Sequence, residues 1–330
     1  MYIKRLLISL LLPLLLLSLV PQAVYATTAD TFQVTSDGAQ QKDAIIHKKT
    51  IAYTNFGGVQ GSDIWGYDLE SELNYPLVER ANEQYLTGHF GKYIVYEDYD
   101  GSDYNLRLFN KNNGHDDLIA GGAGAQVGGV TNGDEIAYVN GGACGSIHLY
   151  DIKKKTDEII SPSGCGPLSI SDRAVVWANG APGGTNIYGY DLKHNVQIDV
   201  VTDDNFQESP NIFDNDVVYV EYTSGVLGDY YAIKMVNIKT YQKKTIYEST
   251  TSTLQGPAVS NKYVVWSEST AQHVNGIQAS FLKTGEVFEV QSQGPHQNSH
   301  TDPTIWKDIA SWMSFRSGNG DIYGSTFEKE

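Results

Sequence analysis

The sequence repeats one short pattern seven times. A run of β-branched or apolar residues ends on an aromatic residue at seven places, at intervals of 43, 42, 39, 42, 47 and 46 residues. These aromatic residues are Tyr53, Tyr96, Tyr138, Trp177, Tyr219, Trp266 and Trp312. A period of about 40 to 50 residues indicates a repeat architecture, in which each unit buries its apolar surface only by packing against its neighbours.

Each unit contains four short runs with the composition of β-strands. A second run follows the aromatic residue, and its clearest copies are "DIWGYDL" at 63–69, "NIYGYDL" at 186–192 and "DIYGSTF" at 321–327. A third run follows a polar turn, and a run of small residues precedes each aromatic residue. No helical period is sustained. The sequence therefore predicts an all-β fold, a seven-bladed β-propeller of four-stranded antiparallel blades.

The seventh unit ends after its third run, so its outer strand is missing. The run "TFQVTS" at 31–36 stands alone before the first unit and resembles the outer strands elsewhere. We expect it to join the last blade and close the ring, which leaves no unpaired edge in that blade.

The pattern "VVW…G…NIYGYDL" resembles the repeats of TolB-type β-propellers, and the resemblance extends over residues 31–330. The runs "YAIKMVNI" and "IQASFL" depart from it because they lack the Asp-Leu ending. Such propellers are common in secreted and cell-surface proteins of bacteria and archaea. The resemblance implies architecture more than activity, since these folds host binding, scaffolding and catalysis alike.

Residues 1–26 have the pattern of a secretory signal peptide. Lys4 and Arg5 precede an apolar run at 6–20, and Val24 and Ala26 form a small-residue cleavage site. We expect cleavage near Thr27, a single propeller domain over 27–330, and a protein that is secreted, extracellular or in the cell envelope. We expect no membrane insertion after cleavage.

The charge of the chain restricts its partners. Loss of Lys4 and Arg5 takes the net charge of −16 to −18, which repels nucleic acid and anionic lipid. An extracellular protein or a glycan is the expected partner of a monomer. The two cysteines, Cys144 and Cys165, are predicted to form a disulfide, as is usual for an exported protein.

The longer loops, which join the second and third strands of a blade and one blade to the next, should share one face. We call it the loop-rich face and predict that it binds ligand. At the start of the innermost strand the repeat places a polar collar, formed by Gln41, Gln84, Gln126, Gln207, Gln255 and His300. Amides suit hydroxylated ligands. The alternative, which we favour, is that these glutamines satisfy backbone groups between blades.

Three histidines, His273, His296 and His300, map to the same face and raise the prospect of a divalent metal site. Their spacing matches no strong metal motif, so surface histidines are the preferred interpretation and no cofactor is assigned. Tyr99, Tyr222 and Tyr230 are candidate ligand contacts in the loops. The run "DYDGSDYN" at 98–105 lacks the spacing of a calcium loop and is read as a solvated turn.

No motif for a catalytic nucleophile, zinc protease or phosphate-binding loop occurs in the sequence. This favours a binding or interaction module for an extracellular polymer or envelope protein over an enzyme. The alternative is a carbohydrate-active enzyme of the polysaccharide-lyase kind, with a metal and histidine site near the mouth of the channel.

Overall fold

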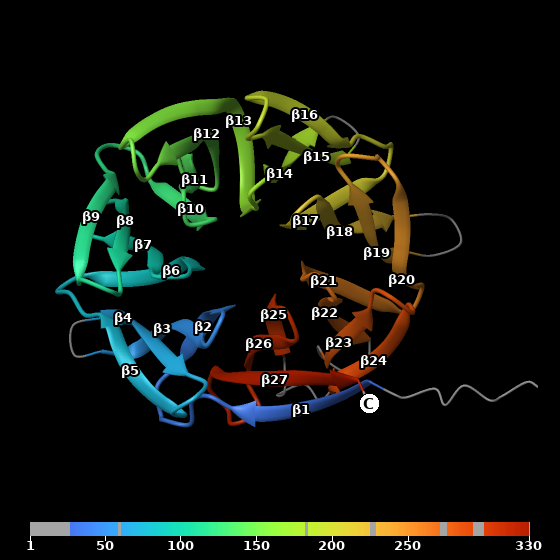
Figure 1. Ribbon diagram of the computed structural model, residues 1–330, viewed down its shortest axis with the longest axis horizontal. Helices are drawn as coiled ribbons and strands as arrows, with labels where there is room; N and C mark the ends of the chain where they lie inside the picture. Colours follow the sequence, from blue (N-terminus) through green and yellow to red (C-terminus); the bar gives the residue numbers. More distant parts are fainter. Residues whose placement is uncertain are drawn as a thin grey trace, which may run out of the picture.

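The computed structural model describes residues 27–58, 61–181, 184–224, 229–270, 276–292 and 300–329. Within these residues the chain forms 27 β-strands and no helix, so the all-β prediction is confirmed. The strands lie in six antiparallel sheets, which Figure 1 shows arranged radially about a central axis. No helix that could cross a bilayer occurs in this part of the chain.

Four of the sheets hold four consecutive strands each, ordered along the chain. The first two contain β2 (Gln41–His47), β3 (Thr50–Gly58), β4 (Gly61–Asp68) and β5 (Leu73–Val78), then β6 (Glu83–Phe90), β7 (Tyr93–Tyr99), β8 (Tyr104–Asn110) and β9 (His115–Ala120). The other two contain β17 (Phe206–Phe213), β18 (Asp216–Thr223), β19 (Tyr230–Asn237) and β20 (Lys243–Ser249), then β21 (Ser252–Val259), β22 (Tyr263–Thr270), β23 (Gly276–Phe281) and β24 (Glu286–Gln291).

A fifth sheet has seven strands, which are β10 (Gln126–Thr131), β11 (Glu135–Asn140), β12 (Cys144–Asp151), β13 (Thr156–Ile170), β14 (Ala174–Ala181), β15 (Gly184–Asp191) and β16 (Val196–Val201). Its 15-residue strand β13 joins two repeat units, because it pairs with β12 in one and β14 in the next (Figure 1). Cys144 and Cys165 lie opposite each other in the β12–β13 ladder and are bonded, so the predicted disulfide is confirmed.

The sixth sheet joins the two ends of the described chain. It contains β25 (His300–Trp306), β26 (Ile309–Ser314), β27 (Asp321–Lys329) and β1 (Thr27–Gln33), and β1 pairs antiparallel with β27 (Figure 1). The N-terminal strand therefore pairs with the last strand as expected, although it begins at residue 27 rather than 31. Phe32 lies opposite Gly324, where a Cβ would come within 2.5 Å of the Phe32 ring.

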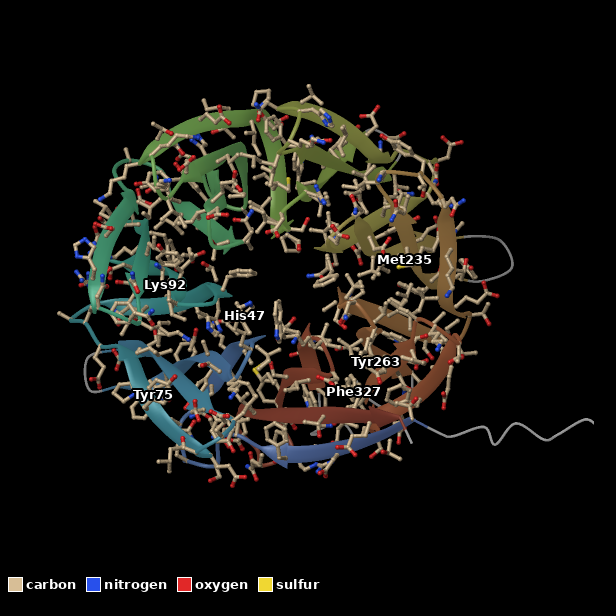
Figure 2. The ribbon with its side chains drawn as sticks, viewed as in Figure 1. His47, Tyr75, Lys92, Met235, Tyr263 and Phe327 are labelled. Carbon is tan, nitrogen blue, oxygen red and sulfur yellow. A yellow bond between two sulfur atoms is a disulfide. The ribbon has the colours of Figure 1, made fainter. Side chains whose placement is uncertain are left out.

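The core lies between neighbouring sheets. All seven repeated aromatic residues are at most 3% exposed, which confirms that they are core positions. Figure 2 shows Phe327 of β27 and Tyr263 of β22 close together, and their rings meet edge to face with centroids 5.0 Å apart. Because the apolar clusters combine residues from adjacent sheets, each repeat unit depends on its neighbours for burial.

The inner strands share a β-bulge shortly after their start. The register with the second strand shifts around Asp43, Ser209 and Asp302, whose φ angles are 56°, 52° and 54°. Gly128 and Gly256 occupy the same position in other units, with φ of 66° and 53°. A residue with a Cβ in this left-handed region costs about 1–2 kcal/mol relative to its usual conformation.

Candidate ligand-binding pocket

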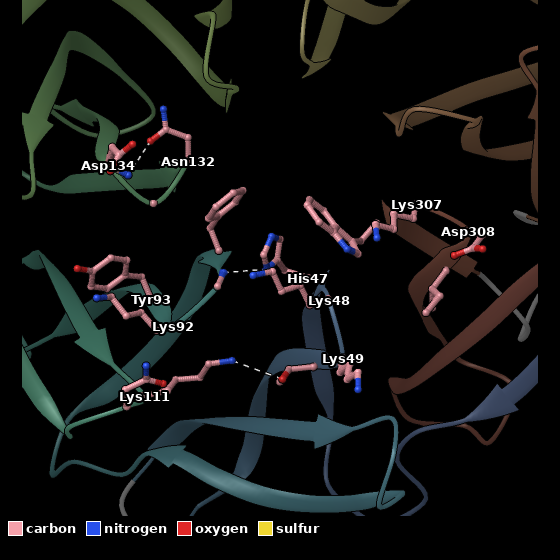
Figure 3. Close-up of a pocket in the computed structure, with 17 residues that line it drawn as sticks. His47, Lys48, Lys49, Lys92, Tyr93, Lys111, Asn132, Asp134, Lys307 and Asp308 are labelled. Carbon is pink, nitrogen blue, oxygen red and sulfur yellow. Dashed lines mark hydrogen bonds between the residues drawn. The ribbon is translucent and has the colours of Figure 1, made fainter.

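A cavity of about 940 Å³ opens on the face opposite the loop-rich face. It is formed by residues 47–50, 90–93, 111–112, 132–134 and 306–309, and we call it the basic pocket (Figure 3). Four of these segments are the turns that follow inner strands β2, β6, β10 and β25, and the fifth follows β8. The repeat thus brings residues separated by more than 200 positions to one site.

Tight hairpin turns build the rim of the basic pocket. Lys48, Gly91 and Lys307 open two-residue turns with φ of 56°, 60° and 58°, as the twist of a β-hairpin favours. Each turn places the last side chain of its inner strand at the pocket. These side chains are His47, Phe90 and Trp306.

His47 lies between two aromatic rings. Its imidazole centroid is 4.2 Å from that of Phe90 and 4.0 Å from that of Trp306, and its Nδ1 accepts a 2.8 Å hydrogen bond from the Gly91 N–H (Figure 3). Burial, with a smaller effect of Lys48, lowers the pKa of His47 to about 4. The ring is therefore neutral at pH 7, and its buried Nε2 has no partner among the described protein atoms.

Lys111 is held at the pocket wall by neutral groups. Its Nζ lies 3.0 Å from Nε2 of His89 and 3.4 Å from the Thr50 hydroxyl. Nδ1 of His89 faces the Ile45 carbonyl at 3.2 Å, so we assign its proton there and leave Nε2 as acceptor. Burial lowers the pKa of His89 to about 3 and that of Lys111 to about 8.

The charge of the pocket is opposite to that of the chain. It is lined by two aspartates, Asp134 and Asp308, and by five lysines, which are Lys48, Lys49, Lys92, Lys111 and Lys307. Lys49 pairs with Glu70, but in the described ranges the other four have no carboxylate within 4.0 Å. On a chain of net charge −16, this cluster is a local attractor for anions.

Four of the predicted collar glutamines lie at the start of their inner strands and are buried, namely Gln41, Gln84, Gln126 and Gln207. The Nε2 groups of Gln84, Gln126 and Gln207 each donate to the backbone carbonyl two residues earlier, while their Oε1 atoms have no partner among the described atoms. Gln41 instead contacts Asp37, Asn55 and the Thr35 hydroxyl.

Gln255 is exposed, because Leu254 takes the buried position in its unit. The backbone contacts of Gln84, Gln126 and Gln207 are local to each segment, so the packing interpretation and the ligand role both stay predictions.

His300 begins β25 and is 1% exposed, and neither of its ring nitrogens has a partner in the described part of the chain. Burial lowers its pKa to about 4. His273 and His296 lie outside the described residues, so the proposed histidine trio is not tested. Within those residues, no group of three His, Cys, Asp or Glu side chains is placed to hold a metal ion.

Tyr222 and Tyr230 lie on the paired strands β18 and β19, whereas Tyr99 belongs to the sheet of β7. Tyr99 packs against Tyr104 with ring centroids 4.8 Å apart. The hydroxyl of Tyr222 donates to Asp229 at 3.0 Å, and that of Tyr230 donates to Glu248 at 2.8 Å. The 98–105 segment forms a turn in which Asp100 accepts backbone hydrogen bonds from the two residues after Gly101.

A Ser–His–Asp chain in the third unit belongs to the packing of its sheet. Ser146 Oγ is 3.0 Å from His148 Nε2, and His148 Nδ1 is 2.7 Å from Asp157, which also accepts the Tyr138 hydroxyl at 3.2 Å. The second unit has the same layer with Tyr96, Arg107 and Asp116 in equivalent positions. Because the layer repeats, we assign these residues to structure.

The basic pocket was not predicted from the sequence. One signal for it exists: four residues before the aromatic residue, several units carry a basic side chain, as in Lys49, Lys92, Arg173 and Lys262. His47, Phe90 and Trp306 share a second repeat position, six residues before the aromatic residue, whereas Lys111 has no such periodicity. Only the radial arrangement of the sheets brings them to one cavity.

The chain is similar to solved β-propeller structures. An oligogalacturonate lyase in complex with manganese matches with a TM-score of 0.69 and 13% identity, over 92% of this chain and 98% of that one. The β-propeller domain of the Trilobed protease from Pyrococcus furiosus matches with a TM-score of 0.66 and 8% identity, over 88% and 95%. BamB from Moraxella catarrhalis matches with a TM-score of 0.51 and 13% identity, over 92% and 100%.

These similarities show a β-propeller fold. At such identities they show the fold alone. No family model matches the sequence, and no curated protein matches it. The finer resemblance to TolB-type repeats therefore stays a prediction.

Proposed function

We propose that the chain is a secreted, seven-bladed β-propeller that binds an acidic oligosaccharide in the basic pocket. In this proposal the seven-stranded sheet accounts for two blades, and β1 closes the ring. The sequence predicted binding on the loop-rich face, whereas this proposal places the ligand on the opposite face. The chain is still proposed to be a binding module, but its binding surface is now the basic pocket.

The observation that carries the proposal is the environment of Lys111. A partly buried ammonium group is costly without a counter-charge, and among the described residues the hydrogen-bond partners of Lys111 are His89 and Thr50. A ligand carboxylate would supply that charge, with Lys48 and Lys307 nearby. Phe90 and Trp306 offer partly exposed aromatic surface for the apolar face of a sugar ring. A uronate combines both features.

Calorimetry with tri-galacturonate at low salt tests this function. The variant Lys111→Met should weaken binding about 10- to 100-fold, because it removes one charged hydrogen-bond donor. Lys193→Met removes the same charge from an exposed turn outside the pocket and should leave the affinity unchanged. Equal affinities of wild type and Lys111→Met, or no binding by either, would contradict the proposal.

A second candidate function is elimination of the bound uronate. A base removes the C5 proton next to the carboxylate, and the C5–H electron pair forms a C4=C5 double bond. The C4–O bond breaks, and the departing oxygen takes up a proton from water. Two observations favour it: Lys111 has a pKa of about 8, within the range of a lysine base, and the first solved structure above is an oligogalacturonate lyase.

The two functions are separated by Lys111→Arg. Arginine keeps the positive charge but is not a base near neutral pH. Elimination should disappear while tri-galacturonate still binds. The measurement is ultraviolet absorbance of the unsaturated product, with and without added Mn²⁺. Unchanged product formation in Lys111→Arg would show that Lys111 is not the base. No product from wild type would leave binding as the only function.

A further inference from the structure

A second, independent site lies on the loop-rich face, where the first three repeat units meet. A groove of about 370 Å³ is lined there by Lys42 and Asp43 of β2, Tyr85 of β6, Glu97 of β7 and Tyr104 of β8. We call it the aromatic groove. It shares no lining residue with the basic pocket.

The groove has an aromatic floor that remains accessible. The ring centroids of Tyr85 and Tyr104 are 6.1 Å apart, and Phe56 continues the series 6.1 Å beyond Tyr85. Both tyrosines are partly exposed, and Phe56 is 37% exposed. Partly exposed, adjacent aromatic rings are suited to stacking against the apolar faces of successive sugar rings.

The polar groups around this floor indicate which ligand charge fits. Lys42 Nζ lies 4.9 Å from the Tyr85 ring centroid and 5.1 Å from that of Phe56, so a cation already lies over one face of each of these two rings. Asp43 accepts a 3.0 Å hydrogen bond from Thr54, and Glu97 accepts a 2.8 Å hydrogen bond from the Gly128 N–H. These two carboxyl groups disfavour a ligand that carries a negative charge.

We infer that the aromatic groove binds a neutral oligosaccharide. Tyr85 and Tyr104 stack against its rings, while Asp43 and Glu97 accept hydrogen bonds from its hydroxyl groups. Burial raises the pKa of both carboxyl groups, which is consistent with a neutral ligand rather than a charged one. The inference does not depend on the basic pocket.

The test is calorimetry with three neutral hexasaccharides, of β-1,4-linked glucose, mannose and N-acetylglucosamine. At least one should bind saturably to the intact chain. Tyr104→Ala should weaken that binding about tenfold, whereas Tyr104→Phe, which keeps the ring, should bind nearly as well as wild type. Tyr241→Ala removes an exposed tyrosine outside the groove and is the matched control.

The thermal midpoint of each variant shows that it is folded. Glu97→Gln, which keeps an acceptor and the shape of the side chain, is a second variant should Tyr104→Ala unfold, and it should weaken binding. Failure of all three sugars to bind wild type would overturn the inference. So would equal affinities of wild type and folded Tyr104→Ala. Neither outcome bears on tri-galacturonate binding at the basic pocket.

Discussion

The Nζ atom of Lys111 lies 3.0 Å from Nε2 of His89. The amine therefore faces a neutral imidazole instead of a carboxylate, and burial lowers its pKa to about 8, with Lys48 acting in the same direction and Asp68 against it. An arriving anion would stabilise the charged form and raise that pKa. Binding and protonation of Lys111 are thus linked.

This linkage predicts proton uptake on binding. At pH 8, where about half of the free Lys111 is charged, tri-galacturonate should bind with net uptake of a proton, and its affinity should fall as the pH rises above 8. Calorimetry in buffers of different ionisation enthalpy measures the uptake. In Lys111→Arg, which stays charged, the uptake should vanish. An unchanged uptake would assign it to another group.

The buried histidines predict a loss of stability in acid. His47 and His89 have pKa values lowered to about 4 and about 3, so between pH 6.5 and 4 the unfolded chain binds protons that the folded chain does not. The free energy of unfolding should fall by about 1.4 kcal/mol per pH unit for each of them. Urea titrations from pH 7 to 4.5 measure the slope.

His89→Gln is the comparison for that slope. Glutamine keeps a donor and an acceptor but does not titrate. The variant should lose less stability than wild type over the same range, even if it is less stable at pH 7. Parallel pH profiles would show that His89 is not responsible.

The close contact between Gly324 and the Phe32 ring predicts that substitutions at these two positions have coupled effects on stability. Gly324→Ala places a Cβ against the Phe32 ring and should destabilise the fold by about 1–3 kcal/mol, measured by chemical denaturation. In a Phe32→Ala background the same substitution should cost much less, because the clashing ring is gone. Additive effects in this cycle would mean that the two residues do not interact.

The backbone conformation of Ser209 predicts that a glycine at this position would stabilise the fold. Its φ of 52° is one that glycine adopts without strain, so Ser209→Gly should raise the free energy of unfolding by about 0.4–1 kcal/mol. Ser209→Ala keeps the Cβ and is the control, with no gain expected. A gain in the alanine variant would point to loss of the hydroxyl rather than relief of the backbone.

The repeat predicted the strands well because each depends on local alternation. The core positions of the seven aromatic residues, the all-β fold and the pairing of the N-terminal strand with β27 could all be predicted from the repeat. The start of β1 was placed at residue 31 rather than 27, because alternation indicates a strand without fixing its register. The third run of the third unit and the small-residue run of the fourth unit form one strand, β13, along which the β12 ladder continues to the disulfide.

The basic pocket could not be predicted in the same way. His47, Lys111 and Trp306 come from different sheets, and their proximity depends on how the sheets are arranged about the axis rather than on any local pattern. Gln41, Gln84, Gln126 and Gln207 were predictable as a set because they share one repeat position, whereas Gln255 lies one residue after it. Their environment was not, since it depends on the loop backbone that each amide contacts.

The pairing of β1 with β27 also constrains when this protein can finish folding. Nearly 300 residues separate the two strands, so at about 5 to 20 residues per second β1 waits roughly 15 to 60 s on the ribosome before its partner exists. Throughout that interval the earliest strand to be synthesised has no ladder to join. The β1–β27 ladder can therefore form only after all the other described strands have been synthesised.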